Sequence, residues 1–451
     1  MCYKGLRNII IAIFILIMPA CLMVAAIEET PKDGTKLVGG ISLEDVFEKA
    51  KEHSYDLKIA DFNLLISKQD IRGARSEYFP KLFLNLGTEY TKNFRDEKDT
   101  TVMTIGEAFI NPYTRFQSVL GITLYYNLFD FGVRGGTLKM AKEDVKIKEL
   151  EEKEKLQELN LNLVDTYAKL LITQKQIEIN KEIITLEEKN LEYRTRLYDA
   201  KEISKTELND QAVKVSVIKN RISELTSIYM ESLNWLSFYT GENYDTEKLK
   251  IAELKKSNFD ITAFKDYTQS LTWQIHEKQL KKKEYELYVA KRNNYPKVNV
   301  YGKYYLYGSD HNNYGESLGI KPSNFSVGAS VNMPVFDGMK NRSNIQKVSL
   351  ELQQLQVERD RAIAQLMTRL ATMRSNIIYL DQQINENNKA IKELKDKEKS
   401  TQKLASKRLI SPMDLNDAKV ELLQQKIELE KNKITSIAIA KGIEILTQTE
   451  N

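Results

Sequence analysis

The sequence predicts a mainly helical protein with a smaller set of long β-strands, built from two copies of one structural plan. One observation is an internal repeat, since the stretch Gly121–Asp130 returns as Gly328–Asp337, 207 residues later. Another is a shortage of helix breakers, because the 451 residues include only 8 Pro and 19 Gly. A repeated unit covers with its own copy the face that it cannot bury alone. We therefore expect residues 27–240 and 261–446 to form two equivalent repeats.

The first 26 residues have the form of a secretory signal peptide. Basic residues precede an apolar run from Ile9 to Met18, which is shorter than the about 20 residues that a membrane span needs. Two processing routes fit this segment. Cleavage after Ala26 satisfies the small-x-small rule, whereas an imperfect lipobox ending at Cys21 would leave that cysteine lipidated. Either route predicts an exported protein.

Each repeat is expected to begin with a helix that stops ahead of a proline. In the first repeat Ser42 is suited to cap the helix, and Asp45 stands where a capping box places its acidic partner. The helical pattern runs to Ser76, with an interruption near Ser54, and stops before Pro80. A Tyr-Pro-Lys sequence stands at the corresponding place in the second repeat, so the same passage from helix to strand is predicted there.

Two β-hairpins are predicted next, near residues 82–130 and 298–337. Leu82, Leu84 and Leu86 share one face of the first strand, and the other strands alternate in the same way. Strands of about ten residues with one apolar face are typical of a transmembrane barrel, although a soluble sandwich also contains amphipathic hairpins. The fold class is therefore mainly α with transmembrane β. Four strands per chain leave open edges, which a bilayer does not tolerate, so we expect several chains to associate.

A long helical hairpin is expected after each pair of strands, at residues 136–240 and 341–446. A helix of some 60 residues is a rod of about 90 Å, and short breaks at residues 201–205 and 408–412 turn the chain back. The returning helices carry apolar residues at every seventh position, which is coiled-coil spacing. These positions are Leu208, Val215, Ile222, Tyr229 and Leu236 in the first repeat, and Leu415, Leu422 and Leu429 in the second.

Composition and motifs argue against an enzyme and against a nucleic-acid-binding protein. The 67 Lys and Arg residues nearly cancel the 63 Asp and Glu residues, whereas a nucleic-acid-binding protein gathers basic residues on one face. His53, His276 and His311 lack metal-ligand spacing, and no glycine-rich phosphate loop is present. We expect no catalytic residue, no cofactor and no metal site.

The candidate functional residues are acidic and lie just inside the predicted helical turns. Asp414 and Asp417 are three residues apart, so they project from one face of a helix. Glu207 and Asp210 occupy the equivalent places in the first repeat. Carboxylates near a helix N-terminus also interact favourably with the helix dipole, so capping alone would account for them.

The whole order of elements resembles the TolC-like outer membrane factors of bacterial efflux and type I secretion systems. Twice, a helix ends at Tyr78-Phe79-Pro80 or Tyr295-Pro296, and a strand pair closes on Leu128-Phe129-Asp130 or Val335-Phe336-Asp337 before a long helical hairpin. The resemblance covers essentially the chain after the signal peptide. It implies a homotrimer whose twelve strands form one barrel in the cell outer membrane. A coiled-coil tunnel of helices would continue that barrel through the periplasm.

The resemblance also implies a function, which is that of a passive exit duct in a tripartite efflux or type I secretion system. An inner-membrane pump of the RND or ABC type would drive transport through a periplasmic adaptor. The turns would form the periplasmic entrance, and the adaptor-contact residues would be Lys201, Ile203, Ser204, Arg408, Ile410 and Ser411.

The same resemblance assigns the acidic residues to a gate. Asp414 and Asp417 match the family's acidic constriction, with Glu207 and Asp210 as their counterparts in the first repeat, and threefold symmetry would arrange them as rings of like charge. Two departures are present. Lys201 and Arg408 replace the family's usual glycine at the turn tips. The arginine that often ties the closed entrance aligns with Ile410, so the closed-state bonds must differ here.

The remaining segments complete this interpretation. Residues 241–260, together with the linker before Ile41 and the chain after Ile439, which ends in a tail at 447–451, are expected to form an equatorial belt. Residues 91–115 and 308–323 are expected to form extracellular loops. Two other functions compete, a secreted structural or adhesive coiled-coil surface protein and a periplasmic adaptor. Matched strands before each rod disfavour the first. An adaptor would carry one helical hairpin between glycine-rich β domains, whereas this chain carries two.

Overall fold

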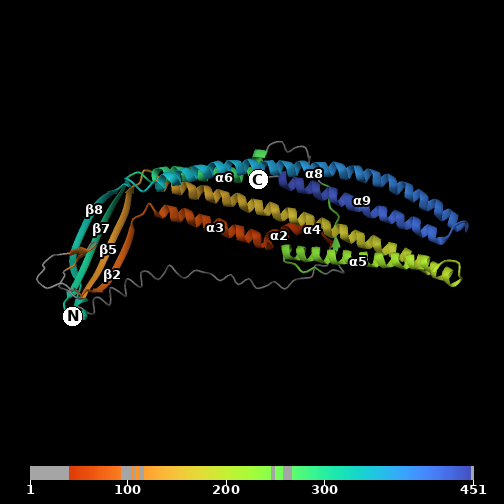
Figure 1. The fold of residues 1–451 in the computed structure, drawn as a ribbon, viewed down its shortest axis with the longest axis horizontal. Helices are drawn as coiled ribbons and strands as arrows, with labels where there is room; N and C mark the ends of the chain where they lie inside the picture. The colour runs from red at the N-terminus through yellow and green to blue at the C-terminus, as the bar shows by residue number, and fades with distance from the viewer. Residues whose placement is uncertain are drawn as a thin grey trace.

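The computed structural model describes residues 40–92, 103–105, 108–110, 116–244, 249–256 and 267–447. This part of the chain is a long rod, with a four-stranded sheet at one end and helices that run to the other end (Figure 1). The expected signal peptide, with Cys21, and the last residues of the tail lie outside the described residues. Within the described ranges, no helix combines the length and the apolar character that a membrane crossing requires.

The first repeat opens with α2 (Leu43–His53) and α3 (Tyr55–Ser76), which Ser54 separates and caps. The predicted capping box is confirmed. The Asp45 backbone N–H donates to Ser42 Oγ at 3.2 Å, and the Ser42 N–H donates to the Asp45 carboxylate at 3.1 Å. In the second repeat the single helix α6 (Leu271–Arg292) takes the place of α3.

The sheet contains both predicted hairpins and joins them. Its antiparallel strands are, in spatial order, β2 (Lys81–Tyr90), β5 (Phe116–Phe129), β7 (Lys297–Asp310) and β8 (Lys321–Asn332). The central pairing of β5 with β7 connects the first repeat to the second. Among the described residues, the outer strands β2 and β8 each have one neighbour, so both edges of the sheet are open there.

The strand register collects apolar residues on one face of the sheet. Leu84 lies opposite Ile122, Ile122 opposite Tyr304, and Tyr304 opposite Phe325. Residues directly opposite each other point to the same face, so these four belong to one apolar surface. The other face carries mostly polar, small and tyrosine residues, with Phe83 and Val119 as exceptions. Its members include Asn85, Thr123, Asn299, Tyr301, Lys303, Tyr305 and Ser330. This separation confirms the alternation predicted from the sequence.

The last strand is shorter than the repeat predicts. β5 runs to Phe129, whose equivalent is Phe336, but β8 ends at Asn332. Its partner β7 begins at Lys297, which pairs with Asn332, so the residues that follow have no neighbouring strand within the described ranges. Pro334 also lacks the N–H that a ladder needs. The hairpin expected to continue to residue 337 therefore loses its pairing earlier.

The expected loops are only partly described. The segment at 308–323 begins with the end of β7, ends with the start of β8, and contains the short helix α7 (Tyr314–Ser317) between them. Within the segment at 91–115, β3 (Met103–Ile105) pairs with β4 (Ala108–Ile110), and most of the remaining residues lie outside the described ranges.

The helices pack side by side in a single layer. The set of helices that forms this layer near the sheet differs from the set farther along the rod. The layer consists of α4 (Val133–Asp199), α5 (Lys205–Thr240), α8 (Lys340–Ser406) and α9 (Pro412–Thr447), together with α3 and α6. Near the sheet the neighbours follow the order α3, α4, α6, α8, and farther away the order α5, α4, α9, α8. The predicted heptad positions face this packing, since Val215, Tyr229, Leu236, Leu422 and Leu429 are buried.

The segment between the repeats packs at the middle of the rod. β1 (Gly40–Ile41) pairs in parallel with β6 (Lys250–Ile251). The hydroxyl of Tyr167 on α4 lies 2.9 Å from the carbonyl oxygen of Ile41 and 2.7 Å from that of Ala252. Tyr167 is only 1 % exposed and belongs to the largest apolar core of the chain, so α4 anchors both strands.

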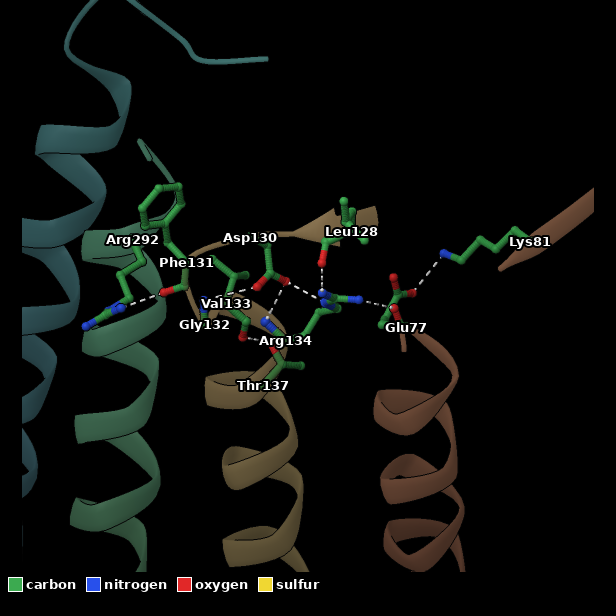
Figure 2. A network of polar contacts seen from close by, with 10 residues as sticks. All are labelled: Glu77, Lys81, Leu128, Asp130, Phe131, Gly132, Val133, Arg134, Thr137 and Arg292. Carbon is green, nitrogen blue, oxygen red and sulfur yellow. Dashed lines mark hydrogen bonds and ion pairs between the residues drawn. The ribbon is translucent and has the colours of Figure 1, made fainter. Parts of the chain in front are cut away.

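The passage from β5 to α4 is a buried polar network (Figure 2). Asp130 is 4 % exposed and accepts the backbone N–H groups of Gly132 and Arg134, each at 3.0 Å, and Arg134 Nε at 2.8 Å. The other guanidinium nitrogens donate to the carbonyl oxygens of Glu77 at 3.2 Å and Leu128 at 3.3 Å. Arg134 thus joins the end of α3, the end of β5 and the start of α4.

The same junction is also held from its other side, by the second repeat. Arg292 Nη1 donates to the carbonyl oxygen of Phe131 at 2.5 Å (Figure 2). The Phe131 ring packs edge-on against Tyr295, with 5.4 Å between ring centroids, and against Phe129, with 4.8 Å. The β5–α4 junction therefore has a neighbour on each side within one chain.

The equivalent junction between β8 and α8 is built differently. Asp337 accepts the backbone N–H of Asn341 at 2.9 Å, which reproduces the local turn. Asn341 stands where Arg134 stands in the first repeat, and among the described residues its buried Nδ2 has no hydrogen-bond partner. Asp337 is exposed, and so are Val335 at 94 % and Phe336 at 79 %. This junction is open on its outer side.

Candidate functional site at the helical turns

The two turns between long helices lie together at the end of the rod farthest from the sheet (Figure 1). In the first turn, the N–H of Lys201 donates to the carbonyl oxygen of Tyr198 and the N–H of Glu202 to that of Leu197, both at 2.9 Å. This pair of bonds is a Schellman motif, which satisfies the last carbonyl groups of α4. Lys201 takes the left-handed conformation that the motif requires, with φ of 61°.

The second turn repeats the first in detail. The N–H of Arg408 donates to the carbonyl oxygen of Ala405 and the N–H of Leu409 to that of Leu404, both at 3.0 Å. Arg408 has φ of 58°. Glycine is the usual residue here, and another residue pays about 1–2 kcal/mol in this conformation. Both turns therefore keep a long cationic side chain at a strained position on an exposed tip.

A serine begins each returning helix, and the first acidic residue of each pair completes its cap. Ser204 Oγ accepts the Glu207 N–H at 3.2 Å and lies 3.2 Å from Glu207 Oε1. In the second turn, Ser411 Oγ accepts the Met413 N–H at 3.1 Å, and the Asp414 carboxylate accepts the Ser411 N–H at 3.0 Å. Glu207 and Asp414 therefore have a structural role as helix caps.

Asp417 has a different set of contacts, which fasten α9 to α4. Its Oδ1 accepts Asn190 Nδ2 at 2.8 Å, and Asn190 Oδ1 accepts Asn416 Nδ2 at 2.8 Å. Asn190 is only 1 % exposed, so it depends on these bonds to satisfy its amide. Asp417 itself is exposed and keeps a carboxylate oxygen free for other interactions among the described residues.

The first repeat uses other residues for the same purpose. Arg194, one turn beyond Asn190 on α4, donates to the carbonyl oxygen of Glu207 at 3.0 Å. Gln211 Nε2 donates to the carboxylate of the buried Glu187 at 2.6 Å. Asp210 is exposed, and no described residue makes a hydrogen bond or ion pair with it. The four acidic residues thus lie on helices that both pack against α4, without a direct bond between the two pairs in the described chain.

The predicted adaptor-contact residues all lie in or beside the turns. Lys201, Ser204 and Arg408 are exposed, whereas Ile203 and Ile410 are half-buried, as is Ser411. Sequence reasoning missed Asn190, Arg194 and Gln211, whose hydrogen bonds connect α4 to the two returning helices. An amide in the middle of a helix that is otherwise rich in strong helix formers was the available signal for Asn190.

The chemistry open to this end of the rod is electrostatic. No group of His, Cys, Asp and Glu among the described residues is arranged to hold a metal ion. The site instead offers cations at the extreme tips and carboxylates one turn inside them. Exposed carboxylates attract cations, and repetition of the same residues around a symmetry axis would strengthen that attraction.

Solved structures that share this architecture include outer-membrane proteins. The outer membrane protein VceC of Vibrio cholerae superimposes with a TM-score of 0.72 at 14 % identity, over 90 % of this chain and 96 % of its own. The CmeC outer membrane channel of Campylobacter jejuni gives 0.73 at 15 % identity, over 91 % and 87 %. The open state of the MtrE outer membrane channel of Neisseria gonorrhoeae gives 0.62 at 14 % identity, over 93 % and 96 %. The rod therefore has the fold of an outer-membrane channel protein.

The chain belongs to the outer membrane efflux protein family, whose sequence profile matches residues 46–242 and 274–435. No curated protein sequence matches it. Family membership confirms the resemblance to TolC-like outer membrane factors and the predicted location in the outer membrane. The family and the structural neighbours are channel proteins, so the alternative of an adhesive surface protein is not supported.

Proposed function

We propose that three copies of this chain form the passive exit duct of a tripartite efflux or type I secretion system. The observation that carries this proposal is the pair of open edges that runs along the whole molecule. One edge consists of β2, α3 and α5, and the other of β8 and α8. A transmembrane sheet needs a closed ladder, and only further copies supply matching strands and helices to both edges.

Apolar residues along both edges support the same proposal. Singly exposed apolar residues are normal, but contiguous exposed apolar surface indicates an interaction site. On the helices of the first edge the exposed residues include Ile59, Phe62, Ile66, Val213 and Val217. On the helix of the second edge they include Leu350, Val357 and Ile378. Burial of these rows between copies would contribute about 25 cal/mol for each Å² removed from water.

In this proposal each part of the chain has one task. The repeats at 27–240 and 261–446 would each supply half of a protomer's share of the duct, and the segment at 241–260 would form the belt around its middle. The turns would meet a periplasmic adaptor, which connects the duct to an inner-membrane pump of the RND or ABC type. The chain would contribute no catalysis, no cofactor and no energy source.

We propose further that the acidic residues act as a gate at the entrance. Asp414 and Asp417 in three copies would form rings of negative charge, with Glu207 and Asp210 beside them. Asp417 and Asp210 are the stronger candidates, because each keeps carboxylate oxygens that the helix caps do not use. Rings of carboxylates select cations and bind divalent ions.

Conductance in a planar lipid bilayer tests the duct and the gate together. The wild-type protein is expected to show a small, cation-selective conductance that millimolar divalent cations block. The variant Asp414→Ala/Asp417→Ala should be freed from this block. Asn416→Ala is a matched control, since it removes a neighbouring bond to Asn190 without removing charge. An unchanged block in the double variant would return both aspartates to structural roles, and no conductance from folded protein would contradict the duct.

A further inference from the structure

The two repeats are equivalent residue by residue in the sheet, and this fixes how one copy meets the next. Each position in β2 has its equivalent in β7, with an offset of 216 residues, as from Lys81 to Lys297. Each position in β5 has its equivalent in β8, with an offset of 207 residues. The observed register obeys both offsets. Leu82 pairs with Leu124 in the first hairpin, and their equivalents Val298 and Val331 pair in the second.

This agreement continues along the hairpins. Leu84 pairs with Ile122, and Val300 with Ala329. Farther along, Leu86 pairs with Leu120, and Thr88 with Ser118. Their equivalents, Gly302 with Val327 and Tyr304 with Phe325, are also paired. The repeat is therefore a repeat of strand register as well as of sequence pattern.

The pairing of β5 with β7 is the contact between the first repeat and the second. Its register can serve as a template for the contact between β8 of one copy and β2 of the next. Within the chain Leu124 pairs with Gly302, and Ile122 with Tyr304. By the same offsets, the position equivalent to Leu124 is Val331, and the position equivalent to Gly302 is Leu86. Likewise, Ala329 is equivalent to Ile122, and Thr88 is equivalent to Tyr304. The equivalent pairs, Val331 with Leu86 and Ala329 with Thr88, connect β8 to β2, which are the two open edges.

We propose that β8 of one copy pairs antiparallel with β2 of the next copy, with Val331 opposite Leu86 and Ala329 opposite Thr88. This register rests on the trimeric duct proposed above and adds its interface. It keeps the apolar faces continuous, because Val331 and Leu86 both belong to the apolar face of the sheet. A shift by one residue would turn the apolar face of one strand toward the polar face of its neighbour.

The open junction after β8 fits the same register. Within the chain, Phe129 lies opposite Val298 after a bulge and next to the rings of Phe131 and Tyr295. The equivalent contact between copies places Phe336, which is 79 % exposed, opposite Leu82 of the next copy, which is 68 % exposed. Residues 333–336 have no strand partner among the residues that the structure describes, and the edge of the next copy supplies one.

Disulfide formation between introduced cysteines tests this register. Residues directly opposite in an antiparallel pair have Cα atoms about 4.5–5.5 Å apart, which suits a disulfide, whereas a diagonal pair is about 7–8 Å apart. β2 and β8 of one chain are separated by two strands, or about 14 Å, so any bond between them must join two copies. The chain's own cysteines, Cys2 and Cys21, both lie in the expected signal peptide.

The experiment compares three double variants after mild oxidation of the detergent-solubilised protein, with single-cysteine variants as controls. Val331→Cys/Leu86→Cys should give a covalent trimer on a non-reducing gel. Val331→Cys/Leu84→Cys and Val331→Cys/Thr88→Cys, each displaced by two residues, should give at least tenfold less. A native mass measurement of each variant shows whether three chains are associated before oxidation. A trimer that is cross-linked best by a displaced pair would overturn the register and leave the duct intact, and a monomer would overturn both.

Discussion

The two strand-to-helix junctions have the same local design and different surroundings. After β5, a buried aspartate is paired with Arg134, and the α3–β2 and α6–β7 connections hold the junction from both sides. After β8, Asp337 makes the same turn into a helix, but Asn341 replaces the arginine and the neighbouring apolar residues are exposed. The sequence repeat produced equal turns, and the position in the sheet made one of them internal and the other an edge.

This difference separates what stabilises the chain from what assembles it. The first junction is complete within the chain, so its residues should affect folding. The second junction lacks a neighbour, so its residues should affect association. Substitutions at equivalent positions can therefore distinguish the two roles.

Arg134→Ala should have the largest effect on the stability of the fold. It leaves the carboxylate of Asp130 buried without its cation, and loss of one partner of a buried ion pair costs about 3–5 kcal/mol. Thermal unfolding in detergent, followed by circular dichroism, measures the loss. The matched control is Asn341→Ala at the equivalent position, which should cost about 1 kcal/mol or less because no charge is left unpaired. Equal losses in the two variants would remove the distinction.

Phe336→Ser should weaken association and leave the stability of the single chain nearly unchanged. The side chain is exposed in one chain, and its cross-strand contact with a second copy would be worth about 0.2–1 kcal/mol at each interface. Dissociation of the oligomer with increasing temperature or detergent, resolved by size, measures this effect. Phe129→Ser provides the contrast. Because Phe129 packs within the chain against Phe131, this substitution should lower the unfolding temperature instead.

Lys201→Gly and Arg408→Gly should each stabilise the fold, by up to about 1 kcal/mol. Glycine removes the strain of a left-handed side-chain-bearing residue, and its greater freedom in the unfolded chain offsets part of the gain. The two turns have equal geometry, so the two gains should be equal, unlike the effects at the two junctions. Unfolding in urea measures them, and a loss of stability in either variant would show that the cationic side chain makes a stabilising contact.

Much of the fold followed from local patterns in the sequence. The repeat of Gly121–Asp130 as Gly328–Asp337 predicted paired strands, and the scarcity of proline and glycine predicted the long rods. The capping box at Ser42 and Asp45 was predictable because it depends on residues three apart. Each of these features is decided by neighbours in the chain, so the sequence alone contains it.

The features that sequence reasoning missed depend on residues far apart. The end of β8 at Asn332 depends on where β7 begins, and the bond from Asn190 to Asp417 joins residues separated by 227 positions. The hydrogen bond from Arg134 to the carbonyl oxygen of Glu77 also joins two elements, the start of α4 and the end of α3. No local period carries such contacts, and the roles of Asp414 and Asp417 as gate residues remain a prediction for the same reason.

The central claim is that one chain is a third of a closed duct. Native mass spectrometry of the protein solubilised in mild detergent tests it most directly, because it counts chains without relying on any variant. A single species with three times the mass of the processed chain is the expected result. A monomer or a dimer as the folded, stable species would contradict the claim, since the edges formed by β2 and β8 would then stay open.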